Sequence, residues 1–126
     1  MIGWVLAALV VVGLLTIGLG GTVAPRSASI QYGIVLADAR ATGLIRAMAA
    51  RDLVIGGLLA VVALGTTRAT LGWAMCLTAF IAAIDLFVVT ADRRATSRSR
   101  LDRATVLHAG GAVGLLVTGT VLLAGC

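Results

Sequence analysis

Four apolar stretches, each long enough to cross a lipid bilayer, make up most of this chain. They are residues 2–24, 43–66, 71–90 and 105–125. A transmembrane helix needs about 20 mainly apolar residues to cross about 30 Å of hydrocarbon. Of the 126 residues, 60% are hydrophobic and 12% are charged, which is too apolar for the surface of a soluble domain. We therefore predict an all-α integral membrane protein, a membrane-spanning four-helix bundle that forms a single domain over residues 1–126.

The distribution of arginine predicts how this bundle lies in the membrane. The connection 25–42 contains Arg26 and Arg40, and the connection 91–104 contains five more arginines, whereas the short connection between them has only Arg68. Cytoplasmic loops carry an excess of basic residues. Loops 25–42 and 91–104 are therefore predicted to be cytoplasmic and both termini to lie on the outer side, in what we expect to be the plasma (inner) membrane. Both tryptophans lie near the predicted outer ends, which fits this orientation.

The net charge of +5 comes largely from the loop 91–104. A basic loop is the ordinary consequence of membrane insertion, and its arginines can contact anionic lipid headgroups. No sequence module that reads nucleic acid accompanies it. Membrane lipids, and not nucleic acid, are the expected partners of this surface.

Ionisable residues inside three of the predicted helices indicate a functional site. Arg51 and Asp52 lie about 8 to 13 Å inside the cytoplasmic end of the second helix, Asp85 about 8 Å inside the third, and His108 about 5 Å inside the fourth. An ionised side chain in the centre of such a helix costs about 2.5 to 3.5 kcal/mol and needs partners or a wet cavity. Adjacent helical residues point about 100° apart. We therefore predict that Arg51 pairs with Asp85, and Asp52 with His108.

The connection 25–42 supplies further candidates. Its segment IQYGIVLA is too apolar for a solvated loop and is expected to lie along the interface or to fold back over the bundle. Gln31, Tyr32 and Asp38 would then line the mouth of the site, where Arg46 adds a positive charge. Gln31, Tyr32 and Arg46 are the predicted substrate-binding residues. The favoured alternative is a surface-lying turn in which Tyr32 is an interfacial anchor.

Three short motifs occur in order along the chain, RDLVIGGLL, AIDLFVV and LHAGGAVGLLVTG, and they contain Arg51, Asp52, Gly56, Asp85, His108, Gly110 and Gly111. Together they resemble a family of small four-span integral membrane proteins that is known only as a domain of unknown function. Members often have a lysine and a glycine before the Arg-Asp pair, where this chain has Met48, Ala49 and Ala50. The resemblance implies a four-span fold and a shared polar site, with no activity to transfer.

Three kinds of function fit the polar residues. In the favoured one, the site binds a lipophilic small molecule and isomerises, cyclises or hydrolyses it. Asp52 or Asp85 would then be the base, His108 the proton donor or shuttle, and Arg51 the stabiliser of negative charge. Histidine suits this role because it ordinarily titrates near neutrality. A small proton-coupled transporter and a structural protein that uses the charges as an interhelical staple remain open. Arg51, Asp52, Asp85 and His108 are the predicted catalytic residues.

Other chemistry is not indicated by the sequence. One histidine and scattered aspartates lack the spacing of metal ligands, so no metal or other cofactor is expected. Cys76 and Cys126 are lone cysteines near the predicted outer side, and two packed thiols are favoured over a disulfide. Gly110 and Gly114 have GxxxG spacing, which predicts a close helix crossing within the bundle, with a homodimer contact as the alternative.

Overall fold

The computed structural model describes residues 1–32, 34, 39–95 and 103–125. They form five α-helices, which are α1 (Ile2–Val23), α2 (Pro25–Tyr32), α3 (Ala39–Gly65), α4 (Arg68–Ala95) and α5 (Arg103–Leu123). Four of them, α1, α3, α4 and α5, are long and apolar enough to cross a membrane. The predicted all-α, four-span membrane fold is confirmed.

Two helices extend beyond the apolar stretches of the sequence. α3 begins at Ala39, ahead of the apolar stretch that starts at residue 43, and α4 continues to Ala95, past residue 90. Hydropathy marks the part of a helix inside hydrocarbon, whereas the backbone hydrogen bonds continue into the interface. The short helix α2 lies in the connection 25–42. It begins at Pro25, and proline suits the first helical position because it lacks the N–H that would remain unbonded there.

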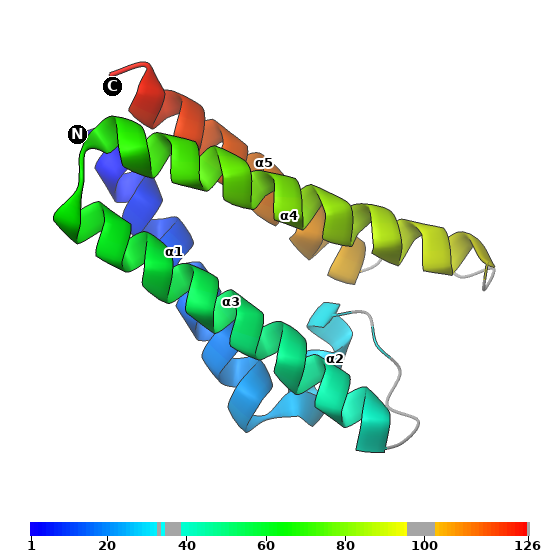
Figure 1. The fold of residues 1–126 in the computed structure, drawn as a ribbon. Helices are drawn as coiled ribbons and strands as arrows, with labels where there is room; N and C mark the ends of the chain where they lie inside the picture. The colour runs from blue at the N-terminus through cyan, green and yellow to red at the C-terminus, as the bar shows by residue number, and fades with distance from the viewer. Residues whose placement is uncertain (33, 35–38, 96–102, 126) are drawn as a thin grey trace.

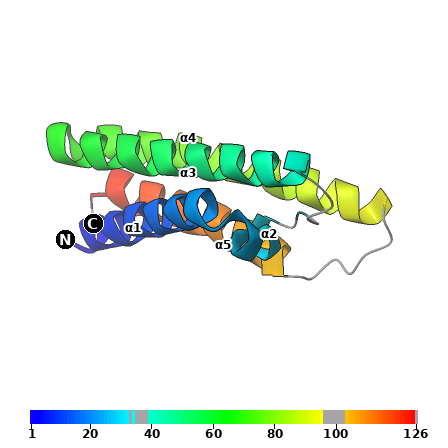
Figure 2. The same ribbon diagram turned by 90° about the horizontal axis from the view of Figure 1, so that it is seen from below.

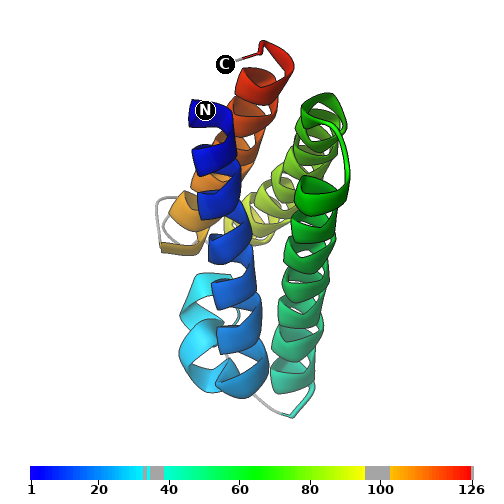
Figure 3. The same cartoon turned by 90° about the vertical axis from the view of Figure 1, so that its left-hand side faces the viewer.

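The long helices pack as two pairs, α1 with α3 and α4 with α5 (Figure 1). The pairs lie close together at the end that holds both termini and the short connection between α3 and α4. They diverge toward the other end, where α2 contacts α1, α3 and α5 (Figures 1 and 3). Seen from below, α3 and α4 form one layer, and α1, α2 and α5 form the other (Figure 2).

Glycine allows each pair to pack with its backbones in contact. A Cβ atom at Gly18 of α1 would lie 2.6 Å from the backbone nitrogen of Leu53 and 2.8 Å from the backbone oxygen of Ala49, both on α3. A Cβ atom at Gly119 of α5 would lie 2.8 Å from the backbone oxygen of Gly72 on α4. Lipid removes the hydrophobic drive between helices, so such close van der Waals contact is what holds a membrane bundle together.

The predicted close crossing at Gly110 and Gly114 is wrong. A Cβ atom at either position, or at Gly111 between them, would meet nothing within 4 Å. The close glycine contact of α5 with α4 is instead at Gly119, nearer the end where the pairs converge. GxxxG spacing puts two glycines on one face, but the divergence of the helix pairs decides whether a neighbour reaches that face.

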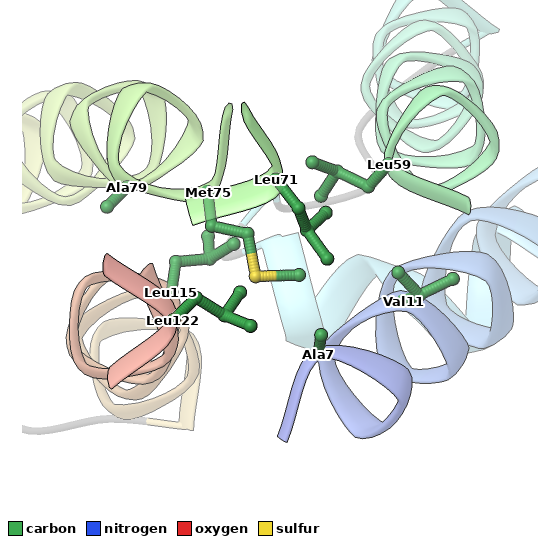
Figure 4. Packing of buried hydrophobic residues seen from close by; sticks show 8 residues of the cluster. All are labelled: Ala7, Val11, Leu59, Leu71, Met75, Ala79, Leu115 and Leu122. Atoms are coloured by element: carbon green, nitrogen blue, oxygen red, sulfur yellow. The ribbon is translucent and has the colours of Figure 1, made fainter. Parts of the chain in front are cut away.

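Two apolar clusters lie on either side of the polar residues along the bundle. One fills the converging end and draws on all four long helices (Figure 4); its members are Ala7, Val11, Leu59, Leu71, Met75, Ala79, Leu115 and Leu122. The other joins α2 to α3 at the diverging end; its members are Ala28, Tyr32, Ile45 and Ala49. On α3, Arg51 and Asp52 follow Ala49 and precede Leu59, so the polar residues lie between the two clusters.

The outer surface of the bundle is apolar. Large apolar side chains are exposed on every long helix, among them Leu9, Val61, Phe80, Phe87 and Val113. In a soluble protein such a surface would cause aggregation, whereas in a bilayer it faces lipid chains.

We expect Gly18→Ala to destabilise the protein and Gly20→Ala to leave it nearly unchanged. The added methyl group at position 18 would press on the α3 backbone, whereas a Cβ atom at position 20 meets nothing within 4 Å. Overpacking of this kind costs about 1 to 3 kcal/mol, and replacing an exposed helical glycine by alanine is neutral or stabilising by up to about 1 kcal/mol. Unfolding of both variants in the same detergent measures the difference. Equal stability would contradict the close α1–α3 contact.

Candidate functional site

The ionisable residues of three helices meet at one cavity of about 110 Å³. Arg51 and Asp52 reach it from α3, Asp85 from α4 and His108 from α5, between the two diverging helix pairs. The other lining residues are mostly apolar; they are Leu14, Ile17, Gln31, Ala82, Leu107, Gly111 and Leu115. Leu115 also belongs to the cluster at the converging end, which therefore closes one end of the cavity.

Arg51 binds both aspartates at once. Its Nη1 donates to Oδ1 of Asp85 at 3.0 Å, and its Nη2 lies 2.8 Å from Oδ2 of the same carboxylate. The Nε and Nη2 groups donate to Oδ1 of Asp52 at 3.3 and 3.0 Å. The predicted pairing of Arg51 with Asp85 is present. The contact to the adjacent residue Asp52 was not expected, because backbone direction alone ignores how far a long, forked guanidinium side chain can reach.

Asp52 is also held by Tyr32. The Tyr32 hydroxyl donates to Oδ2 of Asp52 at 3.0 Å. Among the described residues Asp52 makes no hydrogen bond to His108, so the predicted Asp52–His108 pairing is wrong. The reason is the position of α2, which packs against α3 and brings its own donor to this carboxylate.

Tyr32 is a buried part of the site, and the interpretation of it as an interfacial anchor is wrong. The residue is only 3% exposed, and its ring packs against Gly21, where a Cβ atom would lie 3.1 Å from Cε2. Burial, together with the charge of Asp52 and the hydrogen bond to it, raises the pKa of the Tyr32 phenol. The phenol therefore keeps its proton and acts as a hydrogen-bond donor that fastens α2 to α3.

His108 has one ring nitrogen engaged and one open. Its Nδ1 lies 2.8 Å from the backbone oxygen of Ala104, one turn earlier in α5. Because a carbonyl oxygen can only accept, Nδ1 must carry the hydrogen. Within the part of the chain that the structure describes, Nε2 has no hydrogen-bond partner. A neutral His108 therefore offers the lone pair of Nε2 as a proton acceptor.

The remaining candidate residues from the sequence differ in whether they line the cavity. Gln31 of α2 lines the cavity, whereas Arg46 is exposed and is not among the lining residues. Asp38 and Cys126 lie outside the described residues, and Cys76 is a free thiol. Among the residues that the structure describes, no three His, Cys, Asp or Glu side chains gather so as to hold a metal ion.

Sequence reasoning missed the part that α1 plays in the site. Leu14 and Ile17 line the cavity, yet they belong to a helix that has no ionisable side chain. An apolar side chain that faces a cavity carries no sequence signal that separates it from one that faces lipid. Only the packing of α1 against α3 identifies these residues.

The chain was compared with known protein families, and a family model matches it. Residues 11–122 match the family described as Domain of unknown function (DUF4267). The match covers most of the chain, so the chain belongs to this family, and the resemblance inferred from its short motifs is confirmed. Neither the curated proteins nor the solved structures gave a match. Inferences about activity therefore rest on the geometry of the cavity.

We expect Arg51→Lys to destabilise the protein by about 1 kcal/mol, because a lysine cannot bind two carboxylates in the forked geometry seen here. Arg46→Lys is the matched control; its side chain is exposed, and the expected change is within about 0.5 kcal/mol. Unfolding of both variants by denaturant in one detergent gives the comparison. Wild-type stability of Arg51→Lys would show that a diffuse positive charge is sufficient.

Proposed function

We propose that this DUF4267 member binds a lipophilic small molecule in the cavity between its helix pairs and transfers a proton to or from it. The observation that carries the proposal is a mostly apolar cavity inside a membrane-spanning bundle. Its ionisable groups belong to Arg51, Asp52, Asp85 and His108. A molecule dissolved in the bilayer could place its apolar body against the lining and its polar end among these groups. This combination of apolar walls and a few convergent polar groups is typical of small-molecule sites.

The size of the cavity fits the end of such a molecule. Its volume is about 110 Å³, whereas a dry cavity of about 150 Å³ in another protein holds benzene. A longer ligand would therefore extend out of the cavity between the diverging helix pairs. The cluster of apolar residues at the converging end blocks passage in the opposite direction.

The hydrogen bonds support different proposed roles for the polar groups. Both aspartates are held by Arg51, and Asp52 also by Tyr32, so they serve as fixed negative charges. Three N–H groups of Arg51 donate to carboxylate oxygens, and its Nη2 also lies 2.8 Å from Oδ2 of Asp85, so the guanidinium has little capacity left to stabilise an anion on the ligand. His108 Nε2 is the open nitrogen, and it is our candidate for the group that exchanges a proton with the ligand. The structure thus favours His108 as the base, in place of an aspartate.

The site would face the cytoplasm in the orientation that we propose. The two arginine-rich connections, 25–42 and 91–104, join helices at the diverging end, and the rule that basic loops remain inside places this end in the cytoplasm. The termini would then lie outside, at the converging end.

The interhelical staple accounts for part of the site. The Arg51–Asp85 contact joins α3 to α4 and so links the two helix pairs where they diverge. An interhelical staple alone gives no role to His108 Nε2 or to the apolar cavity. We therefore regard the staple as the support of the binding site.

Transport is less well supported than binding. A carrier needs access to both faces of the membrane. On the described part of α4 and α5 toward the converging end, Thr78 and Thr118 donate their hydroxyls to carbonyl oxygens of their own helices, at 2.8 and 2.7 Å. These hydroxyls are already engaged, and the surrounding cluster is apolar.

Filling the cavity should abolish binding. Gly111 lines the cavity and has space for a side chain, so we expect Gly111→Leu to fill it without disturbing the helix contacts. Gly110→Leu is the matched control, since position 110 has the same free space and does not line the cavity. The chain has one histidine, so ¹⁵N-histidine labelling of untagged protein in lipid nanodiscs reports on His108 alone.

The probe is 1-octanol, a lipophile with one polar end. We expect it to shift the His108 Nε2 resonance in the wild type and in Gly110→Leu, and to leave the resonance unchanged in Gly111→Leu. An equal shift in all three proteins would mean that octanol acts through the bilayer. No shift in any of them would contradict a lipophile site at His108.

A further inference from the structure

The groups around the cavity carry an excess of negative charge. Among the described residues that line the cavity, Arg51 contributes one positive charge, and Asp52 and Asp85 contribute two negative charges, which leaves a net charge of −1 when His108 is neutral. The lining residues from α1 and α2 are Leu14, Ile17 and Gln31, and none of them is ionisable. An uncompensated charge among apolar side chains is unfavourable, so the cavity favours a ligand that brings a positive charge.

The open hydrogen-bonding capacity of the cavity is mainly for accepting. Each carboxylate can accept about four hydrogen bonds. Asp85 receives two contacts, both from Arg51, and Asp52 receives three, from Arg51 and Tyr32. His108 adds the lone pair of Nε2. On the donor side, Arg51 is engaged by both carboxylates, and Gln31 has its amide.

We propose that the ligand is a lipophilic cation that donates hydrogen bonds, namely a protonated amine on an apolar body. The inference rests on the proposed binding role of the cavity. The ammonium group would donate to free lone pairs of Asp85 and to His108 Nε2, while the apolar body lies against Leu14, Ile17 and Leu115. If a proton passes from the ammonium nitrogen to Nε2, the products are a neutral amine and an imidazolium ion. The total charge in the cavity is then unchanged.

The same arrangement works against anionic lipophiles. A carboxylate or phosphate in the cavity would meet two carboxylates, and the guanidinium that could offset the repulsion is already engaged by both. Repulsion of the wrong charge is a common source of specificity. An alcohol of equal length can donate one hydrogen bond but brings no charge, so it should bind more weakly than the amine and better than the acid.

Three probes that share one chain length test this inference. Octylammonium, 1-octanol and octanoate are titrated into the ¹⁵N-histidine-labelled protein in uncharged phosphatidylcholine nanodiscs, with each concentration expressed as probe in the membrane. We expect octylammonium to half-saturate the shift of His108 Nε2 at a concentration about tenfold below that of octanol, equivalent to about 1.4 kcal/mol. Octanoate should give no saturable shift. Asp85→Asn, which removes one negative charge, should bring the half-saturating concentrations of octylammonium and octanol together.

The outcomes separate this inference from the proposed function. If octanol binds as tightly as octylammonium in the wild type, or if octanoate binds best, the inference about charge is overturned and the lipophile site stands. If octylammonium keeps its tenfold advantage in Asp85→Asn, the charge excess is not its cause, and the inference is equally overturned. If none of the three probes shifts His108, both fail. The ranking in the wild type needs no variant, so it decides the question even if Asp85→Asn does not fold.

Discussion

The Arg51 guanidinium, held between the carboxylates of Asp52 and Asp85, is the interaction on which the site depends. It lies where the two helix pairs begin to separate, and its contact with Asp85 links α3 to α4 across this gap. Breaking this contact would leave charges without partners among mainly apolar side chains, which is unfavourable. The same guanidinium leaves the cavity one negative charge in excess, because it compensates only one of two carboxylates. We therefore propose that structural support and ligand preference arise from this one group.

The cavity itself is a consequence of where the glycines lie. Gly18 brings α1 onto α3, and Gly119 with Gly72 brings α5 onto α4, so each pair is tight. Between the pairs, the apolar cluster closes the end near the termini, and α2 occupies part of the opposite end. Tyr32 fastens α2 to Asp52. The site is therefore enclosed on several sides by elements that are each fixed by a definite contact, as a binding site needs if its groups are to hold their geometry.

The sequence predicted how far along each helix the polar residues lie, but it did not predict which way their side chains point. Helical rise, counted from the predicted helix ends, put Arg51, Asp85 and His108 at similar positions along the bundle, and the structure brings them to one cavity. Hydropathy could not reveal that Tyr32 turns inward, because α2 is not a membrane span and its position depends on contacts with Gly21 of α1 and Asp52 of α3. The pairing expected for His108 failed for a related reason, since its nearest acceptor is a backbone oxygen of its own helix.

Photocrosslinking in the membrane tests most directly whether the cavity holds a lipophile. The probe is an eight-carbon alcohol with a diazirine near the middle of its chain, irradiated with the protein in nanodiscs and located by mass spectrometry of the fragments. The account predicts saturable labelling of the cavity residues Leu14, Ile17 and Leu115, which excess 1-octanol suppresses. Labelling confined to lipid-facing residues such as Leu9, Val61 and Phe87, and unaffected by octanol, would contradict it.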